Sequence, residues 1–163
     1  MDTVIQIIII LLFTLVFIQD LKLRAIHISL PILILIFGLI SYFRNGYSVI
    51  NLLYSLAFLI ITFGGLYLYL SAKNKRFTNP FKRNMGLGDV LFFVAVIPFF
   101  SLHNYILFFI TGMLFSIVGF LIIKLVVKTD LVPLAGLLAL YLIILKIASY
   151  SAGFDVFFTN LLN

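Results

Sequence analysis

The chain contains no cysteine and no glutamate among its 163 residues. Without cysteine there are no disulfides, no thiolate metal sites and no cysteine nucleophile, so thiol chemistry is excluded. Every side-chain carboxylate is an aspartate, and there are only five of them. Neither histidine has a partner at metal-ligand spacing, so we expect no metal and no other cofactor.

Charged residues are also scarce, at 10% of the chain, whereas hydrophobic residues make up 64% and the mean hydropathy is +1.30. About a quarter of the residues of a soluble domain are charged, so this composition predicts an integral membrane protein. The net charge is +6. Its cations form short clusters beside apolar runs, where membrane topology explains them better than nucleic-acid binding does. We expect membrane lipids and no nucleic acid as partners.

Polar breaks divide the chain into successive apolar runs. A membrane span needs about 20 apolar residues, so the length of the chain holds about six spans and little else. The prediction is an all-α polytopic protein, a single transmembrane domain over 1–163, whose main cytoplasmic loop covers 71–88. Because the second and fourth runs are short for a full crossing, five spans are the alternative. The start of the chain lacks a basic region and a small-residue cleavage site, which favours a retained first span. The six expected helices cover 3–19, 28–42, 47–70, 88–102, 104–127 and 131–150.

The distribution of basic residues predicts the orientation. Short connections rich in lysine and arginine stay on the cytoplasmic side of a membrane. We therefore expect the first, third and fifth connections to be cytoplasmic and both termini to face outward. These connections hold nine of the eleven basic residues: Lys22, Arg24, Lys73, Lys75, Arg76, Lys82, Arg83, Lys124 and Lys128.

Two of the five aspartates, Asp20 and Asp89, adjoin an apolar run directly and fall at the predicted cytoplasmic boundary. A carboxylate near hydrocarbon costs at least a few kcal/mol, so such groups usually have a function or a specific partner. Taken singly, Asp20 is explained by an ion pair with Arg24 at i+4, and Asp89 by a helix N-cap after a glycine-rich turn.

Together, the two aspartates indicate a different chemistry. Two carboxylates held close cannot easily both ionise, so one keeps a proton while the other acts as general base toward a water molecule. This arrangement hydrolyses a peptide bond, and the proton belongs to the pair rather than to one residue. Gly86 and Gly88 allow a helix or a substrate backbone to come close to Asp89.

Three stretches resemble the prepilin peptidase family, the aspartyl proteases that remove leader peptides from type IV pilin-like precursors. The segment DLKLRAI at 20–26 is similar to the family's first catalytic aspartate with its following basic residues. The segment GLGDV at 86–90 matches the Gly-x-Gly-Asp motif of the second aspartate. The segment VPLAGLLAL at 132–140 looks like the proline-led start of the last core helix. The order and spacing agree from about residue 19 to 140.

The resemblance implies an intramembrane aspartic endopeptidase at the cytoplasmic face of a prokaryotic inner membrane. It implies Asp20 and Asp89 as the catalytic residues, with Gly86, Gly88 and Arg24 supporting the site. The implied partners are type IV pilin-like precursor proteins, recognised through their leader peptides.

The sequence departs from the family pattern at several positions. Leu91 stands where the family often has a lysine, and Ile26-His27-Ile28 replaces a common Ile-Pro-Asn. Family members that also methylate their product carry a cysteine-rich segment, which this chain lacks. We therefore expect no methyltransferase activity.

Other classes of function fit the same two aspartates. In a small cation-coupled transporter or channel, boundary carboxylates would bind a cation or relay protons. In a structural membrane subunit, they would pair with Arg24 and Arg83. Gly-x-Gly-Asp proteases similar to presenilin use more spans than this length holds.

Overall fold

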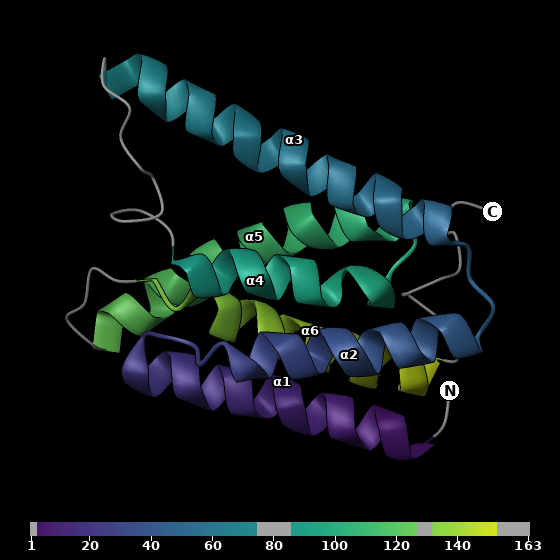
Figure 1. The fold of residues 1–163 in the computed structure, drawn as a ribbon. Helices are drawn as coiled ribbons and strands as arrows, with labels where there is room; N and C mark the ends of the chain where they lie inside the picture. Colours follow the sequence, from purple (N-terminus) through teal and green to yellow (C-terminus); the bar gives the residue numbers. More distant parts are fainter. Residues whose placement is uncertain (1–2, 75–85, 127–131, 153–163) are drawn as a thin grey trace.

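The computed structural model describes residues 3–74, 86–126 and 132–152. Within these ranges the chain forms helices and no strand, so the all-α prediction is confirmed there, and each predicted apolar run overlaps one helix (Figure 1). The elements are α1 (Thr3–Leu23), α2 (Ser29–Arg44), α3 (Val49–Asn74), α4 (Leu87–Val96), the 3₁₀ turn η2 (Ile97–Phe99), α5 (Leu102–Val126) and α6 (Leu134–Ala152).

In the described part of the chain, α1, α3 and α5 are long and apolar enough to cross a membrane, judged by length and composition. The other three apolar segments, namely α2, α4 with η2, and α6, are shorter. At helical rise, α4 and η2 together extend about 20 Å, which is less than the roughly 30 Å of a hydrocarbon core. These helices are compatible with a membrane protein.

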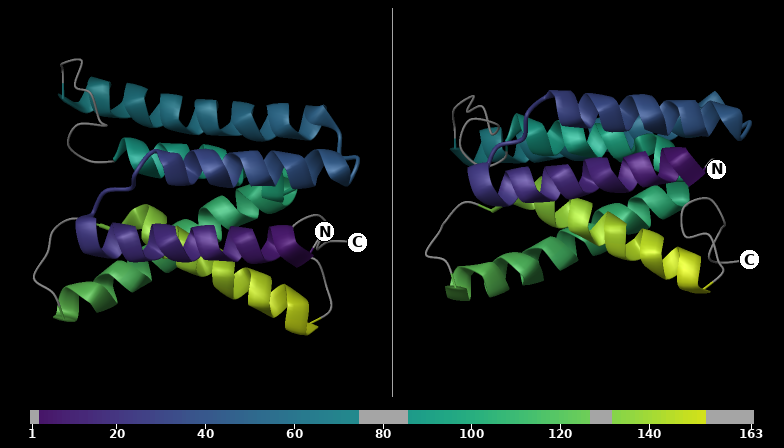
Figure 2. Two further views of the ribbon diagram at one scale, coloured as in Figure 1. Left: turned by 60° about the horizontal axis from the view of Figure 1, so that its bottom comes forward. Right: turned by 90° about the horizontal axis from the view of Figure 1, so that it is seen from below.

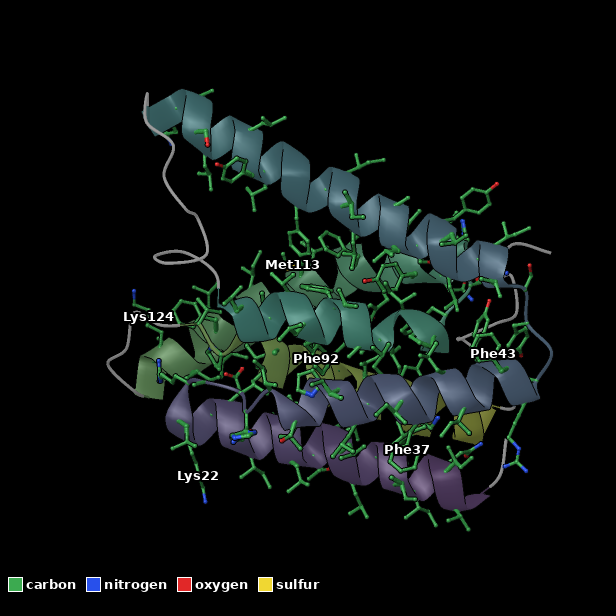
Figure 3. All side chains as sticks on the ribbon, in the orientation of Figure 1. Lys22, Phe37, Phe43, Phe92, Met113 and Lys124 are labelled. Atoms are coloured by element: carbon green, nitrogen blue, oxygen red, sulfur yellow. The ribbon has the colours of Figure 1, made fainter. Side chains whose placement is uncertain are left out.

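Successive helices alternate in direction, so α1, α3 and α5 end where α2, α4 and α6 begin (Figure 1). We call this the carboxylate end of the bundle, because it holds Asp20 in the last turn of α1 and Asp89 in the first turn of α4. The first turn of α6 lies at the same end. Lys22 and Lys124 lie at this end and Phe43 at the opposite end (Figure 3). The loop predicted at 71–88 is shorter on both sides, since α3 continues to Asn74 and α4 begins at Leu87; residues 75–85 lie outside the described ranges.

The core forms where α1 packs against α6 and α2, and where α2 packs against α4. Helix α5 crosses α6, while α3 lies at the outer edge of the bundle (Figure 2). Small residues let α5 and α6 approach closely: a methyl group added to Gly112 would lie 2.8 Å from Leu138. Close contact through glycine is typical of helices that pack within a membrane. The buried side chains of α1, α4 and α6 include Ile9, Leu12, Phe13, Val16, Phe92, Phe93, Ala95, Val96, Leu138, Ala139 and Leu142.

Helix α4 is shorter than its predicted range because of Pro98. Proline has no N–H and its ring clashes with the carbonyl four residues earlier, so the α-helix cannot continue through it. The chain tightens into η2, where the N–H of Ile97 donates to the carbonyl of Val94. The Phe93 carbonyl instead accepts a hydrogen bond from the Tyr105 hydroxyl at 2.9 Å. This hydrogen bond joins the carboxyl-terminal end of α4 to α5, while the first turn of α4 carries Asp89.

Candidate functional site

Asp20 lies in the last turn of α1, on the same face as the buried residues Phe13 and Val16, and is only 4% exposed. A carboxylate this deeply buried needs hydrogen-bond donors to offset its lost hydration. Oδ2 of Asp20 accepts the backbone N–H of Gly136, in α6, at 2.6 Å. The side chain therefore joins α1 to α6.

Asp89 is the third residue of α4. Gly86 has extended backbone angles and serves as the N-cap, a role the sequence had assigned to Asp89 as its simplest explanation. Oδ2 of Asp89 accepts the Gly86 N–H at 3.1 Å, and the Asp89 N–H donates to the Gly86 carbonyl at 3.1 Å. This reciprocal pair satisfies donors that a helix start leaves free. Oδ1 of Asp89 accepts the backbone N–H of Ala135 at 3.1 Å.

The two carboxylates thus meet at the first turn of α6. The first N–H groups of an α-helix have no partner within the helix. Here the N–H groups of Ala135 and Gly136 donate to Asp89 and Asp20, and the next one, on Leu137, donates to the carbonyl of Pro133. We call the N–H groups of Ala135 and Gly136 the amide clamp. It joins three helices, and it brings the aspartates close enough for the charge of Asp20 to act on Asp89.

Gly136 has little room for a side chain. A methyl group there would lie 3.0 Å from Cβ and 3.1 Å from Oδ2 of Asp20, and 3.4 Å from the carbonyl oxygen of Phe17. Contacts near 3.0 Å are tighter than ordinary van der Waals packing, and two of these atoms belong to the rigid part of α1. Glycine at this position therefore allows α6 to reach the carboxylate.

The other predicted site residues lie at the same end. Arg24 ends α1 in a left-handed conformation with φ of 52°, its N–H donates to the Asp20 carbonyl, and its charge acts on the Asp20 carboxylate. A methyl group on Gly88 would lie 3.4 Å from Ile26, so Gly88 packs against the α1–α2 connection. Gly86 contributes its N–H to Asp89. The structure brings together all five residues that the sequence singled out.

Within the described ranges, no group of three potential metal ligands occurs. Nδ1 of His27 is hydrogen-bonded to the Ser29 hydroxyl at 2.8 Å, and the His27 N–H donates to Gln19. His103 lies in the first turn of α5, at the opposite end of the bundle.

The sequence did not single out Ala135 and Gly136. Their contribution comes from backbone N–H groups, which every residue except proline has, so no residue type marks it. One signal was present: Pro133 indicates a helix start, and helix starts present free N–H groups to anions.

A pair of neighbouring carboxylates can act as acid and base together. Repulsion between them favours one shared proton, while the backbone donors favour the charged form. Among the described residues, Asp20 is buried, whereas Asp89 is partly exposed.

No protein-family model, curated protein or solved structure matches this chain. Its class follows from its own features: the described residues form helices and no strand, and three of these helices are long and apolar enough to cross a membrane. Its candidate site is a pair of aspartates that accept hydrogen bonds from successive backbone N–H groups of one helix.

Proposed function

We propose that this protein is an intramembrane aspartic endopeptidase of the prepilin peptidase type, with Asp20 and Asp89 as its catalytic residues. One observation carries the proposal: carboxylates from α1 and α4 converge on two successive N–H groups of α6. A dyad of this kind is what hydrolysis by paired carboxylates requires.

In the proposed mechanism, one aspartate of the dyad acts as a base and the other as an acid. The ionised carboxylate removes a proton from a water molecule, which attacks the scissile carbonyl, while the protonated carboxylate polarises the carbonyl oxygen. The tetrahedral intermediate collapses as a proton returns to the leaving amine. Water and substrate approach from the side of Asp89, because Asp20 is enclosed between α1 and α6.

The proposed topology has six spans in a prokaryotic inner membrane, with both termini outward and the carboxylate end toward the cytoplasm. The positions of Lys22, Arg24, Lys73 and Lys124 support it, because all four lie at or beside the helix ends of the carboxylate end. Basic residues of this kind remain cytoplasmic. The connection between α3 and α4 then forms the main cytoplasmic loop.

The proposed substrate is the leader peptide of a type IV pilin-like precursor, without methylation of the product. A leader on the cytoplasmic side reaches a site at that boundary. The two aspartates attract a basic leader, and the surrounding cations bind anionic lipid headgroups.

The alternative is a small cation-coupled transporter or channel. The burial of Asp20 favours it, because ionisable groups within a helix bundle often relay protons. This alternative predicts cation flux across liposomes that contain the protein, and no cleavage of any precursor.

Co-expression with a pilin-like precursor tests the proposal. Asp20→Asn and Asp89→Asn should each lower leader removal by at least about 10³-fold, because neither residue can then share the proton. Asp2→Asn, which alters an aspartate at the start of the chain, is the matched control and should leave cleavage unchanged. Expression and helical circular dichroism should stay at wild-type levels in all three variants.

Each contrary result has its own meaning. Cleavage that persists in a purified Asn variant removes that residue from the mechanism. Cation flux without cleavage favours the transporter. Loss of folded protein in both Asn variants, without flux or cleavage in the wild type, assigns the aspartates to helix assembly alone.

A further inference from the structure

We propose that the amide clamp is a positioning device: the N–H groups of Ala135 and Gly136 hold Asp20 and Asp89 as one titrating pair, and residue 136 must be glycine for this. The inference deepens the proposed function and rests on it only for the effect on cleavage. The coupling of the two carboxylates is measurable without any substrate.

The hydrogen bonds single out α6 as the element that positions both aspartates. Three carboxylate oxygens accept backbone N–H groups: one on Asp20 from Gly136 and two on Asp89, from Ala135 and Gly86. Gly86 belongs to the same turn as Asp89 and cannot fix its distance from Asp20. The clamp donors are adjacent peptide groups of one helix, so the spacing between them is set by rigid backbone geometry.

The packing supports the same assignment independently. Gly136 and Gly119 both face another helix, and a methyl group on either would come within 3.0 Å of a neighbour. At Gly119 the neighbour is the terminal methyl of Leu137, which can rotate away. At Gly136 the neighbours are Cβ and Oδ2 of Asp20, so an added methyl group displaces the carboxylate from its donor.

Among the described residues, few charges act on the pair. Arg24, from the α1–α2 connection, acts on Asp20, and Asp20 acts on Asp89. The first turn of α6 brings apolar side chains and N–H groups only, and His27 is hydrogen-bonded to Ser29. A long arginine side chain adds charge without fixing a distance, so the spacing of the carboxylates depends on the clamp.

Gly136→Ala should therefore change the titration of the pair. Backbone donors favour the ionised carboxylate, so a weakened bond to Asp20 lets the pair take up its proton at higher pH. In cleavage assays the acidic limb of the pH profile should move to higher pH. The kcat should fall about 10- to 100-fold with little change in KM, because the clamp touches the carboxylates and not the substrate.

Infrared titration of the full-length protein in liposomes measures the pair directly. With five aspartates and no glutamate, the chain has few carboxyl bands, and Asp→Asn variants assign them. Compared with the wild type, Asp89→Asn should shift the titration of Asp20, and Asp20→Asn should shift the titration of Asp89. Gly136→Ala should shift the pair, whereas the matched control Gly119→Ala should titrate like the wild type.

A backbone ester tests the same inference if Gly136→Ala fails to fold. Lactic acid in place of Ala135 deletes the N–H donated to Asp89 and adds no bulk. The control is the corresponding ester at Leu137, whose N–H donates to Pro133 in the same turn. The ester at 135 should shift the titration of the pair, and the ester at 137 should not.

The outcomes separate this inference from the proposed function. Unshifted titration in both Gly136→Ala and the ester at 135 overturns the positioning role, even if the enzyme cleaves a precursor. Equal shifts in Gly119→Ala or the ester at 137 also overturn it, because the effect would then be general loosening. Coupled titration that depends on the clamp, in a protein that cleaves no precursor, supports the inference and removes the proposed function.

Discussion

Helices α1 and α3 are both long and apolar enough to cross a membrane, yet they differ in how they pack. More than twice as large a share of α1 as of α3 is buried within the structure. Helix α1 packs between α2 and α6, whereas α3 lies at the outer edge and contacts α5, η2 and α4 (Figure 1). Apolar composition therefore identifies a helix that can enter a membrane, but it does not identify its neighbours.

The difference follows from how each helix presents its residues. In α1 the buried positions Ile9, Phe13, Val16 and Asp20 recur every three or four residues and form one face. Among the described residues of α3, only Ser55 and Leu59 are buried. Asp20 is part of the candidate site because the buried face of α1 contacts α6.

The largest effect on stability is expected from Phe13→Ala in α1. Phe13 is 2% exposed and its ring lies 6.2 Å from that of Phe92 and 5.8 Å from that of Phe99. Removing a buried phenylalanine side chain should lower the free energy of unfolding by about 3–5 kcal/mol. Reversible unfolding in mixed micelles measures this loss.

The control for that measurement lies on α3. Ile61 is 74% exposed, so Ile61→Ala should change the free energy of unfolding by no more than about 0.5 kcal/mol. Equal losses in the two variants would mean that α1 and α3 are packed alike, against the contrast described above.

A smaller effect, of opposite sign, is expected from Gly64→Ala and Gly65→Ala in α3. A methyl group at either position meets nothing within 4 Å among the described residues. Each substitution should raise the free energy of unfolding by about 0.5–1 kcal/mol, because alanine favours the helix over glycine. Gly38→Ala is the contrasting variant: its methyl group would lie 2.9 Å from the Phe99 ring, so thermal denaturation should show a loss.

The smallest effect is expected from Ser55→Ala. The Ser55 hydroxyl is buried and has no hydrogen-bond partner within the part of the chain that the structure describes. Deleting a hydroxyl without a partner should change the free energy of unfolding by no more than about 0.5 kcal/mol. A loss above about 2 kcal/mol in chemical denaturation would instead reveal a polar contact that holds α3 to the bundle.

Much of the fold could be predicted from the sequence because apolar runs and polar breaks determine where helices begin and end. The predicted helix 88–102 was wrong in its second half, where Pro98 ends α4 and produces η2. The predicted end of α3 was too early, since polar residues continue the helix to Asn74. Burial was not predictable, because α1 and α3 look alike in composition.

The side chains of the candidate site could be predicted from the sequence, but its backbone donors could not. Asp20 and Asp89 adjoin apolar runs, and alternating helix directions place them at one end of the bundle. The clamp could not be predicted, because its donors are peptide groups and the tight fit of Gly136 against Asp20 depends on how α6 meets α1. Whether the pair cleaves a precursor stays a prediction until the Asn variants are assayed.

Donors built from peptide groups respond unusually to mutation. At Ala135, any replacement other than proline keeps an N–H group of the kind that Asp89 accepts, so the donor itself does not depend on the residue type. At Gly136 every replacement adds atoms in tight contact with Asp20. The two neighbouring positions thus face different constraints: Ala135 is fully buried, so packing limits its side chain while its N–H donor is independent of residue type, and Gly136 is limited by the space beside a single carboxylate.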